Sequence, residues 1–312
     1  MKRIILAGGS GFVGQALAPI LLAKGCEVIV LGRSAAHRKN GIDHQQWDGK
    51  TIGGWASAIE GADAIVNLTG KNINCRHTAE NRREIMSSRV DSVRVLGEAI
   101  ARCSTPPKVF VQTSGVGYFG ETSTAVADED APPGSDFPAE VCRHWEGAFD
   151  ALDLPATRKV VLRLGVVLGR EGGALPVLEK LTRWFLGGAV GNGRQYISWI
   201  HVADIVSMFV SAMEQQKFAG VFNATSPLPV TNNEFMRELR RALHRPWSPP
   251  VPAPLVRIGA WFMGSDGKLA LLSSRCVPRR FLEHEFPFQF PNLRDALADL
   301  YRDGDRAPSL QP

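Results

Sequence analysis

Cysteine is scarce in this chain of 312 residues, and the few that occur are not paired by their spacing. There are five, an odd number, and none belongs to a C-x-x-C pair: Cys26, Cys75, Cys103, Cys142 and Cys276. This usage argues against a disulfide framework and a zinc ribbon, and it favours a reducing compartment. No His, Cys and Asp residues have metal-ligand spacing, so we expect no metal site.

Long hydrophobic runs are also missing. The apolar run behind Met1-Lys2-Arg3 extends only from Ile4 to Ala7 before Gly8 interrupts it. A signal peptide needs a longer stretch, and a membrane span needs about 20 apolar residues. The net charge of +5 is small and scattered, with no basic stripe interleaved with aromatic residues. We therefore expect a cytoplasmic protein that binds neither a membrane nor nucleic acid.

The chain instead alternates short apolar strands with helices. Its composition, 44% hydrophobic and 21% charged, is that of a globular protein with a sizeable core. Continuous apolar strands that alternate with helices are typical of a parallel sheet covered on both faces. The expected strands are 4–7, 28–31, 64–68, 109–112, 160–164 and 221–224, and the expected helices are 12–24, 80–102, 139–152 and 202–215. Phe286, Phe288 and Phe290 alternate as in a half-buried strand.

A glycine-rich loop lies between the first strand and the first helix, where a dinucleotide-binding motif would lie. Its glycines have the spacing G-x-x-G-x-x-G in the segment Gly8-Gly9-Ser10-Gly11-Phe12-Val13-Gly14. The first permits a tight turn, the second lets the backbone approach a pyrophosphate, and the third lets helix and strand pack closely. The N-terminus of the helix then offers free N–H groups to the phosphates.

The end of the second strand predicts which dinucleotide binds. An NAD site usually has Asp or Glu there to bind the ribose 2′-hydroxyl, whereas this strand ends in Gly32-Arg33. A guanidinium can hold a 2′-phosphate, which a carboxylate would repel. The sequence therefore favours NADP (NADPH) over NAD. The alternative for Arg33 is a solvated surface cation.

Further motifs connect the chain to a known family. They are Asn67-Leu68-Thr69-Gly70, Ser88-Arg89-Val90, Ser114-Gly115-Val116-Gly117-Tyr118-Phe119-Gly120, Arg163 to Gly169, Gly191-Asn192-Gly193-Arg194-Gln195, Trp199 to Asp204, and Phe222 to Pro227. With the glycine loop, they make the chain resemble an extended short-chain dehydrogenase/reductase over about residues 1–302. More narrowly, it resembles the epimerase-like YfcH-type subfamily of NADP-dependent oxidoreductases.

The resemblance implies cofactor contacts from the end of the third strand, from the helix after it and near the nicotinamide. These residues are Leu68, Thr69, Gly70, Glu84, Arg89 and Val166. Arg89 falls where ordinary extended members have an Asn beside the nicotinamide ribose. An exposed helix face is the alternative for Glu84 and Arg89, because Arg82, Arg83 and Glu84 form a run of charges.

The catalytic pattern of the superfamily is absent. Its members use a Ser with a Tyr and a Lys four residues apart, and no Y-x-x-x-K occurs here. Ser114 and Tyr118 are the remaining catalytic candidates, since they end a central strand; Tyr118 could instead pack or bind substrate. For substrate binding we consider Arg194, in a glycine-rich loop, and His201. A surface role is the alternative for Arg194, and a hydrogen-bonded structural role is the alternative for His201. Cys142 fits an inert buried thiol.

The sequence as a whole predicts an α/β, Rossmann-type, doubly wound parallel sheet with a smaller C-terminal region that caps the substrate. We expect residues 1–166 to form the NADP-binding domain, with about residues 201–225 completing its sheet. Residues 167–200 and 226–302 would form the cap, and residues 303–312 a disordered tail. The predicted function is that of an oxidoreductase or epimerase acting on an unknown small polar substrate. The alternative function is that of a non-catalytic NADP(H) sensor, and a third hypothesis is an interaction scaffold. The sequence does not decide whether the protein forms a homodimer.

Overall fold

In the computed structural model of the chain, residues 2–252, 254–255 and 272–302 are described. A central sheet of eight strands dominates the larger part of the molecule, and all neighbours in it are parallel except β3 and β4. Across the sheet the strands are β12 (Gly220–Ala224), β7 (Arg158–Leu164), β6 (Val109–Gly115), β5 (Ala64–Asn67), β1 (Arg3–Ala7), β2 (Glu27–Gly32), β4 (Ile42–Gln46) and β3 (His37–Lys39). The predicted doubly wound sheet is confirmed.

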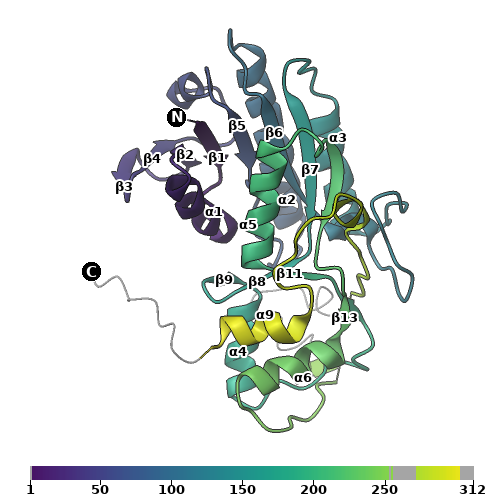
Figure 1. Cartoon of the computed structure of the whole chain (residues 1–312). Coiled ribbons are helices and arrows are strands. Elements are labelled where there is room, and N and C mark those ends of the chain that lie inside the picture. Colours follow the sequence, from purple (N-terminus) through teal and green to yellow (C-terminus); the bar gives the residue numbers. More distant parts are fainter. Residues whose placement is uncertain (1, 253, 256–271, 303–312) are drawn as a thin grey trace.

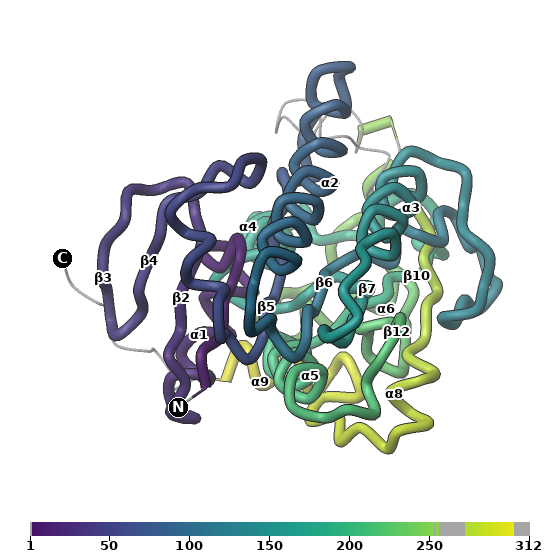
Figure 2. Tube along the Cα trace, turned by 90° about the horizontal axis from the view of Figure 1, so that it is seen from above, coloured from purple at the N-terminus to yellow at the C-terminus, as the bar shows by residue number. Residues whose placement is uncertain are grey.

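Helices cover both faces of this sheet (Figure 2). Helices α1 (Phe12–Ala23) and α5 (Val202–Glu214) pack on one face, and α2 (Ala79–Ala101) and α3 (Phe137–Asp150) pack on the other. Successive strand residues point to opposite faces, so continuous apolar strands feed two cores. In β1, Ile4 and Leu6 belong to the first core, whereas Ile5 and Ala7 belong to the second.

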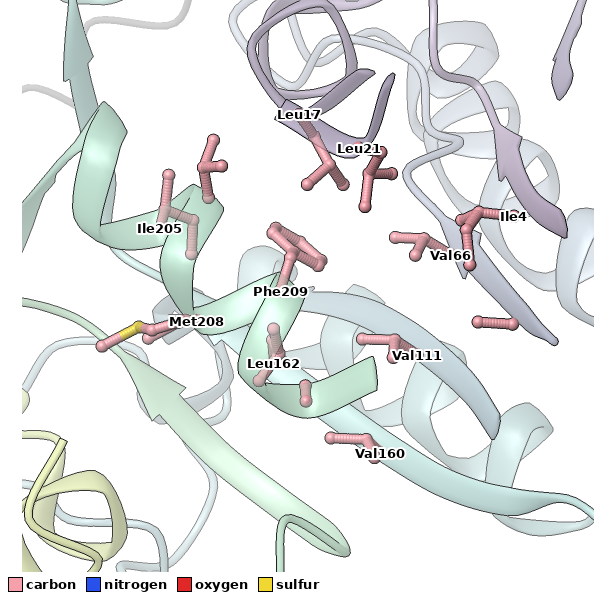
Figure 3. Packing of buried hydrophobic residues seen from close by; sticks show 14 of the residues in the cluster. Ile4, Leu17, Leu21, Val66, Val111, Val160, Leu162, Ile205, Met208 and Phe209 are labelled. Atoms are coloured by element: carbon pink, nitrogen blue, oxygen red, sulfur yellow. The ribbon is translucent and has the colours of Figure 1, made fainter. Parts of the chain in front are cut away.

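The first core shows how the helices are held. Leu17 and Leu21 of α1 and Phe209 of α5 meet over the strand residues Val66 and Leu162 (Figure 3). All five side chains are at most 2% exposed. This packing fixes the N-terminus of α1 relative to the strand ends.

A smaller region lies beyond the end of the sheet at which β7 ends (Figure 1). It contains the three-stranded sheet β11-β8-β9, the ribbon β10-β13 and three helices around a third core. Its elements are β8 (Val166–Gly169), β9 (Gly172–Gly173), α4 (Leu175–Arg183), β10 (Tyr196–Ile197), β11 (Trp199–His201), β13 (Val230–Thr231), α6 (Asn232–Ala242) and α9 (Leu293–Leu300). Short helix α8 (Arg279–Glu283) packs beside β12 instead.

Two local features differ from the sequence predictions. The hairpin β3–β4, which the pattern did not indicate, extends the sheet beyond β2. The strand predicted around Phe288 is wrong, because the N–H groups of Gln289 and Phe290 donate to the Asp204 carboxylate and not to a strand. The aromatic side chains still pack inward. The predicted tail, 303–312, lies outside the described residues.

Candidate functional site

The strand order places a candidate site beside β1. The chain leaves β1 for β2 on one side, while β5 lies on the other. In doubly wound sheets, ligands bind in the crevice that this reversal opens at the carboxyl ends of the strands. The glycine loop, Arg33 and residues 68–70 all follow carboxyl ends at this point.

The glycine loop forms a backbone cradle that larger side chains would fill. Gly8 has φ +72°, and a Cβ there would lie 2.9 Å from Oγ1 of Thr69. A Cβ on Gly14 would lie 2.3 Å from the carbonyl oxygen of Gly9, so α1 starts in direct contact with the loop. Gly11 caps α1 without a side-chain hydrogen bond, and the first N–H groups of a helix have no partner within it. The cradle therefore fits a pyrophosphate.

Phe12 joins this loop to the smaller region. Its ring packs on the β8–β9 hairpin, where a Cβ on Gly169 or Gly172 would approach ring atoms to 2.5 and 2.7 Å. Thus the first residue of α1 is fixed from both sides, by the loop and by the hairpin. The predicted residue Val166 begins β8, the first strand of this hairpin, and is 37% exposed.

The end of β2 presents a cation at the edge of the cradle. Arg33 is exposed and forms no ion pair with any residue that the structure describes. Its carbonyl accepts from Nε2 of Gln46, and a Cβ on Gly32 would lie 3.7 Å from Oγ of Ser10. No carboxylate follows β2 in sequence until Asp43, which pairs with Arg38. No acid directly after β2 therefore competes with a ligand phosphate for Arg33, and Asp48, which follows the neighbouring strand β4, accepts from the N–H groups of Lys50 and Thr51.

A buried polar network shapes the end of β5. The Asn67 amide donates to Ser92 and Gln112, and its oxygen accepts from the N–H of Thr69. This bond turns the chain so that Thr69 packs directly against Gly8. Oγ1 of Thr69 is buried without a hydrogen-bond partner. An unpartnered buried hydroxyl is costly, and a bound ligand would satisfy it.

Helix α2 supplies the charged side chains next to residues 68–70. Nζ of Lys71 pairs with Glu84 and donates to Asn81, which lowers the pKa of the Glu84 carboxyl. Nη1 of Arg89 donates to the carbonyls of Lys71 and Ile85, each at 3.0 Å. Glu84 is exposed at the surface, whereas Arg89 is half-buried beside Gly70.

The two catalytic candidates diverge although they lie four residues apart. Oγ of Ser114 is buried and has no partner that satisfies hydrogen-bond geometry. It lies beside Cys142 of α3, whose Sγ donates to the carbonyl of Gly115. Burial raises the pKa of Cys142 to about 11, so this thiol is neutral. The 3₁₀ turn Val116–Phe119 carries Tyr118 away to Arg163, whose Cζ lies 3.5 Å from the centre of its ring. Arg163 is itself paired with Glu146.

The substrate candidates lie in different environments. Arg194 is exposed, and its N–H donates to Asn192. His201 is buried: Nδ1 accepts from the N–H of Ala203, and Nε2 lies 3.5 Å from Asp299. Burial lowers the pKa of His201 to about 4, so the ring is neutral and caps α5. A substrate contact by either residue stays a prediction.

Fold and site together define a dinucleotide-binding α/β protein. The chain belongs to the NAD dependent epimerase/dehydratase family, whose model matches residues 4–224, and a domain of unknown function, DUF1731, matches residues 251–300. Within the described residues, no helix combines the length and apolar character needed to cross a membrane.

Related proteins match over nearly the whole chain. The bovine (Bos taurus) epimerase family protein SDR39U1 is 38% identical, covering 96% of this chain and 99% of the relative. YfhF of Bacillus subtilis is 32% identical, with 96% and 98% covered. The crystal structure of human SDR39U1 (isoform 2) with NADPH is 34% identical, with a TM-score of 0.86 and 96% and 99% covered.

Proposed function

We propose that this chain binds NADPH and acts as an atypical short-chain dehydrogenase/reductase, an oxidoreductase or epimerase for a small polar substrate. The observation that carries the proposal is the glycine cradle with an unpaired Arg33 at its edge, where β2 ends without a carboxylate. The NADPH in the crystal structure of the human relative supports the choice of nucleotide. Membership of the narrower YfcH-like subfamily is part of the same proposal.

Different residues of the site would contact different parts of the cofactor. Gly8 to Gly14 would hold the pyrophosphate, and Gly32 and Arg33 would hold the ribose with its 2′-phosphate. Residues 68–70 would line the crevice toward the nicotinamide, with Glu84, Arg89 and Val166 at that end. NADPH supplies a hydride at this end when bound.

Proton transfer must then come from a group other than a tyrosine next to a lysine. Ser114 remains the better placed candidate, because its unpartnered hydroxyl lies at the carboxyl end of β6. Tyr118 would have to leave the guanidinium of Arg163 to reach the crevice. Arg194 and His201 complete the proposed substrate side, with His201 acting through the β11–α5 corner that it holds.

A sensor that binds NADPH without turnover is the second candidate. The thiol of Cys142 favours the sensor, because it lies beside Ser114 and is neutral, whereas activating the Ser114 hydroxyl would need a charged partner.

One experiment separates the two functions. NADPH deuterated at C4 is incubated with the protein and a panel of small aldehydes, ketones and keto acids, and products are analysed by mass spectrometry. Deuterium in any product supports the enzyme. Tight NADPH binding by calorimetry without deuterium transfer contradicts the oxidoreductase, and no binding of NADPH contradicts the oxidoreductase, the epimerase and the sensor alike.

A further inference from the structure

Arg89 is held in a fixed position at the edge of the crevice. Its two bonds to the carbonyls of Lys71 and Ile85 both use Nη1. The guanidinium carbon lies 5.0 Å from the centre of the Trp145 ring on α3. A Cβ on Gly70 would lie 3.0 Å from that same carbon, so the group borders the chain segment that follows β5.

The positive charge of Arg89 has no counter-ion among the residues that the structure describes. No carboxylate lies within ion-pair distance, and Glu84, five residues earlier on α2, is taken by Lys71. Burial removes water from the Arg89 guanidinium and so lowers its pKa. A partly buried, unpaired charge is costly, and an anionic partner would offset that cost.

The structural role of Arg89 does not require this charge. Two carbonyl oxygens need only two N–H donors, which a neutral amide provides. The Nε and Nη2 groups form no hydrogen bond with the described residues. These two groups form one edge of the guanidinium, the geometry that binds a carboxylate or phosphate through two parallel hydrogen bonds.

The side chains that α3 places next to Arg89, Trp145 and Cys142, carry no charge. Trp145 and Cys142 are three residues apart on α3 and so share one face of that helix. Cys142 is a neutral thiol whose Sγ lies 3.6 Å from the carbonyl of Gly115, directly after Ser114. Cys142 interacts with both Arg89 and Ser114, which brings these two side chains to the same part of the site. The acid nearest to them on α3, Glu146, is paired with Arg163.

We propose that the Nε–Nη2 edge of Arg89 binds an oxyanion of the substrate, so that the substrate is a small carboxylate- or phosphate-bearing compound. This inference rests on the proposed function, because it places the substrate next to a bound nicotinamide. It goes beyond the cofactor contact predicted for Arg89. It also makes the exposed Arg194 secondary for charge recognition.

Calorimetry on the full chain saturated with NADP⁺ tests this. The probes are oxamate, inorganic phosphate and oxamide, the neutral counterpart of oxamate. We expect oxamate or phosphate to bind at least 10-fold more tightly than oxamide. Arg89→Gln should remove that preference, Arg89→Lys should retain part of it, and Arg83→Gln, an exposed arginine on the same helix, should retain all of it.

The outcomes separate the two levels of the proposal. If no nucleotide binds the natural chain, the proposed function fails and this inference fails with it. If NADP⁺ binds but neither oxyanion binds better than oxamide, or if Arg89→Gln leaves their binding unchanged, only the inference is overturned. Thermal melting and NADPH affinity of each variant show whether Arg89→Gln has acted by unfolding residues 70–71; unchanged melting with lost oxyanion binding supports the inference.

Discussion

Replacing Arg33 by Asp should convert the nucleotide preference of this chain. The side chain extends from the end of β2 at the edge of the glycine cradle, where it is exposed and unpaired. Aspartate would repel a 2′-phosphate but accept a hydrogen bond from a 2′-hydroxyl. We therefore expect NADPH binding to weaken and NADH binding to stay equal or improve.

The size of the effect follows from the exposure of Arg33. Two unit charges about 4 Å apart interact by about 1 kcal/mol in bulk water and about 4 kcal/mol near a protein surface. Exposure and buffer salt favour the lower end, about 1 to 2 kcal/mol. The substitution removes that attraction and adds a repulsion of similar size, about 2 to 4 kcal/mol in all. At about 1.4 kcal/mol per tenfold, NADPH affinity should fall by about 30- to 700-fold.

Calorimetric titration with NADPH and with NADH, at two salt concentrations, measures this directly. The natural chain should prefer NADPH, and the preference should shrink at high salt. Arg294→Asp is the matched control, because Arg294 is an exposed arginine on the distant helix α9. Equal weakening of NADPH and NADH in Arg33→Asp, or no change in either, would refute the assignment of Arg33 to the 2′-phosphate.

Three further substitutions test the cradle and the core. Gly14→Ala places a Cβ 2.3 Å from the Gly9 carbonyl oxygen, so it should weaken NADPH and NADH alike and lower the melting temperature; unchanged binding would contradict the cradle. Because burial lowers the pKa of His201 to about 4, the unfolded chain gains a proton near pH 6.5 while the folded chain does not. In urea titrations, the free energy of unfolding should therefore fall by roughly 2 kcal/mol between pH 8 and pH 5. His201→Asn, which can still cap α5, should not show this pH-dependent loss. Arg163→Met removes the ion-pair partner of Glu146, so the free energy of unfolding should fall by about 3 to 5 kcal/mol. The double variant with Glu146→Gln should recover most of that loss. Additive losses in the two single variants and the double variant would show that the two residues do not act as a pair.

Local sequence rules predicted much of the fold. The apolar strands had to be buried on both faces, and continuous runs such as Ile4 to Ala7 indicate a parallel sheet wherever they occur. Gly14 could be assigned because only a missing side chain allows helix and loop to touch. The absence of a carboxylate after β2 is likewise readable from the chain alone.

The hairpin β3–β4 could not be predicted this way. Its residues are mostly polar, exposed in β3 and half-buried in β4, so they lack the apolar run that indicates a strand. They are strands only because β4 pairs with β2 and β3 pairs with β4. The strand expected around Phe288 failed for the opposite reason. Its alternation was correct, but the buried carboxylate of Asp204 took the N–H groups that a strand would have needed.

The sequence by itself determined the scaffold and the glycine loop at the end of β1, because those depend on contacts between near neighbours in the chain. The tertiary structure alone decided the chemistry at the other end of the site. It stacked Tyr118 on Arg163 of a neighbouring strand, buried His201 behind α9, and left Arg89 charged and unpaired beside Gly70. Each of these outcomes depends on which distant side chains surround a group and how much water they exclude, and neither quantity is encoded in local spacing.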